Sequence, residues 1–170
     1  LTYAYKAVEL IWDSLPEVVN GSQGEPMNRM MEGSFFAGKA INISKTTAPH
    51  AISYAFTTHY GIPHGHAVAL SLPFFLRFNF QVDEKCCIDP QGPPHVQQKI
   101  SKLHSIMNTS PENAYSKLRG FISSLGLEVS IDVLIPNFES SLITDNVNTE
   151  RLNNNPRRVT KGDVIEFIKN

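Results

Sequence analysis

One stretch of the sequence decides the fold. Residues 49–78 read Pro49-His-Ala-Ile-Ser-Tyr-Ala-Phe-Thr-Thr-His-Tyr-Gly-Ile-Pro-His64-Gly-His-Ala-Val-Ala-Leu-Ser-Leu-Pro-Phe-Phe-Leu-Arg-Phe78. A proline is accepted in the first turn of a helix, so a helix is expected from Pro49 towards Thr58. Gly61-Ile62-Pro63 then breaks the chain. Apolar residues follow almost all the way round 64–78, which is typical of a helix buried centrally in a bundle.

Helical periodicity continues before this pair. Residues 3–18 place apolar side chains at spacings of three and four, as one face of an amphipathic helix does. A second helix follows, and its methionines and one phenylalanine are interpreted as core residues on its buried side. These residues are Met27, Met30, Met31 and Phe35.

The second half of the chain carries weaker signals. A helix is expected over 96–107, and another is expected to start at Ser110-Pro111-Glu112, with a capping serine and a proline in the first position. Residues 129–134 could form one short strand. Residues 146–155 form a polar connector, and Thr160 with Asp163 has the spacing of a capping box for a last helix. The pattern predicts an all-α helical bundle.

Composition excludes several classes of protein. The length of 170 residues fits one domain, which we place at 1–170. Lys and Arg number 15 and Asp and Glu 16, and this balance lacks the basic footprint of a nucleic-acid binder. The most apolar stretch, 67–78, is too short to span a bilayer. The two cysteines, Cys86 and Cys87, are adjacent and cannot staple distant segments, so a reducing, cytoplasmic location is expected.

Histidines are concentrated in the deciding stretch, where His50, His59, His64 and His66 fall within seventeen residues. Imidazole is the commonest transition-metal ligand. A tight turn between two helices can bring the first turn of one, with His50, close to the start of the next, with His64. Such a pair is also a common surface or core feature, and two imidazoles alone do not complete a metal site.

Residues 38–73 resemble the C-terminal helical domain of iron-containing (group III) alcohol dehydrogenases, a two-domain, dehydroquinate synthase-like fold. The resemblance lies in two histidines fourteen residues apart, the second in the motif Pro63-His64-Gly65. The opening helix and the closing Asn154-Asn155-Pro156 are similar as well. Within the family, the segment from residue 40 to His50, Ala-Ile-Asn-Ile-Ser-Lys-Thr-Thr-Ala-Pro-His, is most similar to phosphonoacetaldehyde reductases.

The resemblance implies a site and its cofactors. His50 and His64 are the implied ligands of iron(II), with zinc as a second possibility, and the other two ligands are expected upstream of Leu1. The nucleotide-binding domain for NAD(P)H is then also absent from this chain, which alone is expected to reduce no aldehyde. Tyr54 occupies a position where the family commonly has a third histidine linked to proton transfer, and His66 is a candidate neighbour of the metal. A homodimer is implied.

A phosphonate substrate needs cations and N–H donors. Lys45, with Asn42 and Thr46, lies just before the helix that carries His50 and is the first candidate. Arg157 and Arg158 are the second. Two alternatives remain open, namely a family member that acts on another small alcohol or aldehyde, such as lactaldehyde or butanol, and a non-catalytic helical interaction module.

Overall fold

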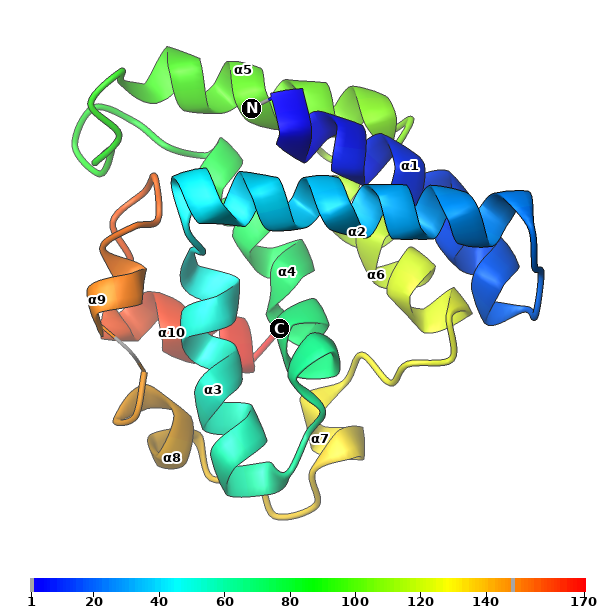
Figure 1. Ribbon diagram of the computed structural model, residues 1–170. Coiled ribbons are helices and arrows are strands. Elements are labelled where there is room, and N and C mark those ends of the chain that lie inside the picture. The colour runs from blue at the N-terminus through cyan, green and yellow to red at the C-terminus, as the bar shows by residue number, and fades with distance from the viewer. Residues whose placement is uncertain (1, 148) are drawn as a thin grey trace.

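The computed structural model describes residues 2–147 and 149–170, with the side chains of Thr149 and Glu150 left aside. These residues form helices joined by turns and contain no β-strand (Figure 1), which confirms the all-α prediction. None of the described helices is both long and apolar enough to cross a lipid bilayer. The helices are α1 Thr2–Val19, α2 Glu25–Ser44, α3 Ala48–Tyr60, α4 His64–Phe80, α5 Pro93–Ile106, α6 Ala114–Ser124, α7 Ile131–Leu134, α8 Ser140–Thr144, α9 Thr149–Leu152 and α10 Lys161–Ile168.

The turn between α3 and α4 forms where the sequence predicts it. Gly61 adopts the left-handed conformation at φ 67°, and its N–H donates to the carbonyl oxygen of Thr57 at 3.1 Å. Glycine adopts this conformation without steric cost, so the helix can end there in one residue. Ile62 is buried behind the turn, and Pro63 caps α4. This three-residue connection packs α3 and α4 side by side.

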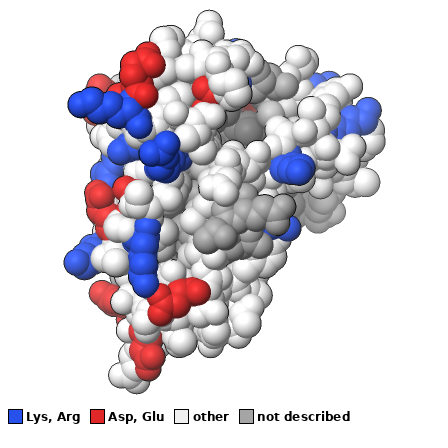
Figure 2. Space-filling model, turned by 90° about the vertical axis from the view of Figure 1, so that its left-hand side faces the viewer, with Lys and Arg blue, Asp and Glu red and all other residues white. Residues whose placement is uncertain are grey.

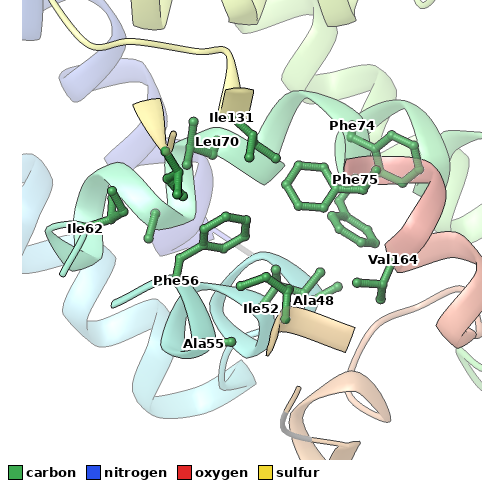
Figure 3. Packing of buried hydrophobic residues seen from close by; sticks show 14 of the residues in the cluster. Ala48, Ile52, Ala55, Phe56, Ile62, Leu70, Phe74, Phe75, Ile131 and Val164 are labelled. Atoms are coloured by element: carbon green, nitrogen blue, oxygen red, sulfur yellow. The ribbon is translucent and has the colours of Figure 1, made fainter. Parts of the chain in front are cut away.

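The core lies between α3, α4 and α10. Phe56, Phe75 and Val164 point toward one another from these three helices (Figure 3), and all three are at most 2% exposed. The ring of Phe167, also on α10, contacts Phe56 edge-on with ring centroids 6.3 Å apart. Burial of one such side chain contributes roughly 1.5–3 kcal/mol. The core therefore fixes the helices that carry the clustered histidines, and α4 is buried centrally, as expected.

The α1–α2 hairpin corrects one prediction. Met31 is 66% exposed and Phe35 58% exposed, so the interpretation of these residues as core was wrong. The side of α2 that faces α1 is set by Gly33, because a methyl group added there would lie 2.7 Å from Cγ1 of Ile11. Met31 and Phe35 each lie two residues from Gly33, about 200° around the helix, and therefore point outward.

Two boundaries in the second half also differ from the predictions. Helix α6 begins at Ala114, and Ser110 to Asn113 form a turn before it, with the Asn113 N–H donating to the Ser110 carbonyl oxygen at 3.2 Å. Residues 131–134 form the single helical turn α7, not a strand, since apolar residues at such short length fit either structure. The connector holds α9, and Asn148 within it lies outside the described residues.

The last helix begins at the predicted cap. The backbone N–H of Asp163 donates to the Thr160 hydroxyl at 3.2 Å, and the Thr160 N–H donates to the Asp163 carboxylate at 2.7 Å. These two bonds satisfy donors that a helix start otherwise leaves without a partner. The capping box thereby fixes the start of α10, which supplies Val164 and Phe167 to the core.

Candidate metal and substrate site

His50 and His64 are brought together by the α3–α4 turn. Their ring centroids lie 5.5 Å apart at an interplanar angle of 61°. An ion bonded at about 2.1 Å to one nitrogen of each ring would place the ring centres about 5 Å apart. Both rings lie on the outer side of helices whose other side forms the core, His50 half-buried and His64 exposed. The two rings therefore have the spacing that a shared metal ion requires.

Ser53 links the two histidines. Its hydroxyl donates to the carbonyl oxygen of His50 at 2.8 Å and lies 3.3 Å from Nδ1 of His64. A serine hydroxyl has one hydrogen, and here it is used by His50. The same oxygen can accept a hydrogen bond from Nδ1–H of His64, and in that tautomer the lone pair of Nε2 is available to a ligand. Ser53 is fully buried and was not among the residues predicted from the sequence.

An aromatic and a cationic group continue the site. The Tyr54 ring lies 5.4 Å from the His64 ring and is 40% exposed. The guanidinium carbon of Arg151, on α9, lies 4.9 Å from the centre of the Tyr54 ring. Nη1 of Arg151 also donates to the hydroxyl of Thr46 at 3.0 Å. The sequence did not single out Arg151, which lies 105 residues from Thr46 and in a connector without a motif.

The protonation of His50 follows from its surroundings. Burial lowers the pKa of His50 below its usual value, and the nearby side chains of His64 and Arg151 lower it further because each opposes a second positive charge. A lowered pKa keeps the imidazole neutral near pH 7. The neutral ring is the form that binds a metal ion.

Lys45 occupies an unusual backbone position at the end of α2. Its φ of 60° and ψ of -168° fall in a region that is used almost only by glycine. The side-chain amide of Asn154 donates to the carbonyl oxygens on both sides of Lys45, at 3.0 Å to Ser44 and at 2.8 Å to Thr46. Lys45 lines a groove of about 600 Å³ between α4, α5 and residues 153–156. Asn42 is exposed on the last turn of α2.

Three other sequence candidates lie apart from the histidine pair. The Arg157 guanidinium packs 3.8 Å from the Phe78 ring centre and donates to the Phe78 carbonyl oxygen at 2.8 Å. Phe78 follows His64 by fourteen residues, about 21 Å along α4. Arg158, whose N–H donates to the Cys86 carbonyl oxygen, is exposed in the same region. Nε2 of His66 lies 2.6 Å from the carbonyl oxygen of Glu128, in the loop before α7.

Comparison with known proteins decides the family. Residues 2–170 match the C-terminal part of the Fe-containing alcohol dehydrogenase family. The chain belongs to this family. It is 30% identical over 161 residues to the phosphonoacetaldehyde reductase of Streptomyces viridochromogenes, a match that covers 95% of this chain and 39% of that protein. The chain thus spans about two fifths of the length of this relative.

Solved structures agree on the fold. An alcohol dehydrogenase from Oenococcus oeni superposes with a TM-score of 0.81 at 24% identity, over 99% of this chain and 44% of that one. A sulfoacetaldehyde reductase from Bifidobacterium kashiwanohense, solved in complex with NAD+, superposes with a TM-score of 0.78 at 24% identity, over 99% of this chain and 42% of that one. These likenesses identify the helical bundle as the C-terminal domain fold of iron-type alcohol dehydrogenases.

The dehydrogenase family is named for a metal, and the histidine pair is this chain's candidate for part of a metal site. Within residues 2–147 and 149–170, no group of three or more His, Cys, Asp and Glu side chains could hold a metal ion. The histidine pair fits the metal as two nitrogen donors at a suitable spacing. A complete coordination shell would need donors from elsewhere.

One side of the molecule carries charges of both signs. Figure 2 shows one side of the molecule, on which basic and acidic side chains alternate along the left edge. The formal net charge of -1 agrees with this mixture. The described residues on this side therefore form no broad basic field.

Proposed function

We propose that this chain forms the metal- and substrate-binding part of an NAD(P)-linked alcohol dehydrogenase that reduces a small aldehyde. Phosphonoacetaldehyde, reduced to 2-hydroxyethylphosphonate, is the substrate we propose. The observation that carries the proposal is the packing of the His50 and His64 rings at 5.5 Å on two helices fixed by the core. The remaining metal ligands and the coenzyme site would come from the part of the enzyme that its relatives have in addition.

Different residues of this chain would have different roles in the reaction. His50 and His64 would hold iron(II) or zinc, and such an ion polarises a carbonyl group and stabilises the negative charge that develops on its oxygen. The Ser53 oxygen would accept from Nδ1–H of His64, so that Nε2 faces the ion. Tyr54, whose ring lies 5.4 Å from the His64 ring, would donate a hydrogen bond to the substrate oxygen. Bound NAD(P)H would supply a hydride to the carbonyl carbon, and the oxygen would take up a proton.

The substrate class rests on the match to the phosphonoacetaldehyde reductase and on the polar segment before His50. Lys45 and Thr46 lie in the connection from α2 to α3, and the side-chain amide of Asn154 binds the backbone on both sides of Lys45. A fixed polar segment next to a pair of metal ligands is suited to an aldehyde with an anionic group at its other end.

The test is the metal content of the complete enzyme. His50→Ala and His64→Ala are each expected to remove most of the bound metal and to abolish reduction of both phosphonoacetaldehyde and propionaldehyde. His59→Ala, an exposed histidine on the last turn of α3, serves as the control and should retain both. Retention of stoichiometric metal and of turnover in His64→Ala would overturn the proposed site.

A further inference from the structure

We propose that Arg151 is the specificity-determining cation of this enzyme. In this proposal its guanidinium binds the phosphonate or sulfonate group of a small aldehyde whose carbonyl lies at the histidine pair. The proposal rests on the proposed function and adds the residue that selects the substrate. The sequence candidates for this role were Lys45, Arg157 and Arg158, and none of them is Arg151.

The first argument for this role is the position of Arg151 relative to the histidines. Its guanidinium carbon lies 4.9 Å from the Tyr54 ring centre, and that ring lies 5.4 Å from the His64 ring. His64 in turn contacts His50 at 5.5 Å. The Tyr54 ring thus contacts both the guanidinium and the ring of one proposed metal ligand. A substrate with its carbonyl at the histidines and its anion one or two carbons away spans a gap of this kind.

The second argument is that contacts within the protein already restrict the Arg151 side chain. Nη1 donates to the Thr46 hydroxyl at 3.0 Å, and the guanidinium rests on the face of the Tyr54 ring. The amide of Asn154 fixes the Thr46 backbone through its carbonyl oxygen at 2.8 Å. Stacking and a hydrogen bond restrict the long side chain before any ligand arrives, which reduces the entropy lost on binding.

The third argument is the chemistry of the guanidinium group. A guanidinium presents five N–H donors in a planar fork that matches two oxygens of a phosphonate or sulfonate. Arg151 is exposed, so a ligand can reach it from solvent. Lys45 lines the groove beside α5, and Arg157 packs on Phe78 near the far end of α4. Among the described residues, Arg151 is the cation in contact with the ring that packs on His64.

The test compares two substrates in the complete enzyme. Arg151→Gln is expected to lower kcat/KM for phosphonoacetaldehyde by about ten- to a hundredfold and for propionaldehyde by less than about threefold. Arg151→Lys should fall between Arg151→Gln and the wild type, because it keeps the charge and loses the fork. The inhibition constant of methylphosphonate should rise in parallel with the loss. Arg29→Gln, which removes a half-buried arginine paired with Asp13, is the control and should change kcat/KM for neither substrate.

The outcomes separate this proposal from the one on which it rests. Equal losses on both aldehydes, or no loss on either, would overturn the role of Arg151 while leaving the reductase intact. A wild-type enzyme that prefers propionaldehyde to both phosphonoacetaldehyde and sulfoacetaldehyde would overturn the anion site alone. A metal-loaded wild type that reduces no aldehyde would overturn the proposed function, and this proposal with it. The melting temperature of each variant shows whether the fold is kept, and Arg151→Lys serves where Arg151→Gln does not fold.

Discussion

The α3–α4 pair and the α1–α2 hairpin are both antiparallel helix pairs with short connections, and they treat their apolar residues differently. Seven of the thirteen residues of α3 are buried, whereas the buried residue of the longer helix α2 is Gly33. Helix α3 packs on α4 and shares a core with α10, but α2 packs mainly on α1. The proposed ligands thus lie on the pair that the core holds rigidly, and the hairpin presents an apolar face to solvent.

The rigid pair is where positioning is required. Metal ligands and the groups that orient them must be held within narrow limits, which packed helices achieve better than loops. Ser53 illustrates the arrangement, because it is part of the buried side of α3 and still reaches His64. The hairpin carries neither of the proposed metal ligands. Substitution of its exposed residues Met31 and Phe35 is therefore expected to leave the two histidines in place.

The sharpest test of this contrast removes one phenylalanine from each pair. Phe56→Ala should lower the free energy of unfolding by about 3–5 kcal/mol, because it leaves a cavity in the core between α3, α4 and α10. Phe35→Ala should change it by less than about 0.5 kcal/mol, because the ring is exposed. Urea unfolding of the two variants measures both. A large loss in Phe35→Ala would mean that another surface covers α2 in the complete enzyme.

The second test concerns the proton on His64. Ser53→Ala removes the acceptor for Nδ1–H and should weaken metal binding by about ten- to a hundredfold, as loss of such an outer partner typically does. Ser71→Ala is the matched control, since Ser71 is also buried and donates to a carbonyl oxygen three residues earlier, at 3.3 Å. Competition with a chelator measures both dissociation constants. Equal weakening in the two variants would show that Ser53 acts on the stability of the helix only.

The same contrast shows what the sequence could predict. The α3–α4 pair was predicted because its signals are local, with a proline at one start, Gly61 at the turn and apolar residues all round the second helix. The buried face of α2 was not predicted correctly, because the apolar residues of this helix mark two possible faces. The choice between them depends on the close approach of Gly33 to Ile11, which no local pattern records.

The proposed site divides in the same way. His50, His64 and Tyr54 were found through their spacing and the family motif. Arg151 and Ser53 were missed for different reasons. The first meets Thr46 only through the tertiary fold, and the second is indistinguishable in sequence from any small residue on the buried side of a helix. The candidates Arg157 and Arg158 were basic residues near a motif, a signal that does not indicate which end of α4 they approach.

The third test addresses the strained connection between the hairpin and the rigid pair. Lys45→Gly should raise the free energy of unfolding by about 1 kcal/mol, because glycine adopts φ 60° and ψ -168° without the strain that a lysine side chain brings. Part of the gain is offset by the larger freedom of glycine in the unfolded chain. Lys39→Gly, within α2, should instead lower it by about the same amount. A loss of stability in both variants would show that Lys45 is held by contacts stronger than its strain.

The smallest effect is expected at His104, on the helix α5 that packs against both α1 and α4. The ring is 3% exposed, lies 5.1 Å from the Phe80 ring, and has no hydrogen-bond partner for either nitrogen among the described residues. Burial lowers the pKa of His104, although the Glu112 carboxylate partly opposes this shift. The folded protein therefore resists protonation of this ring at a pH where the unfolded chain accepts it.

The sign of the pH dependence follows from this difference. Below about pH 6.5 the unfolded state binds more protons at this position than the folded state, so stability falls as the pH falls and is retained above that value. At pH 6 the loss from one such ring is at most about 0.8 kcal/mol. His104→Leu should flatten the decline between pH 7 and pH 5.5, and His59→Leu, at an exposed position on α3, should leave it in place. Unfolding curves at several pH values distinguish the two variants. If stability declines with pH in His104→Leu as steeply as in the wild type, the ring accepts its proton in the folded state. Helix α5 would then have to move away from the hairpin and the α3–α4 pair.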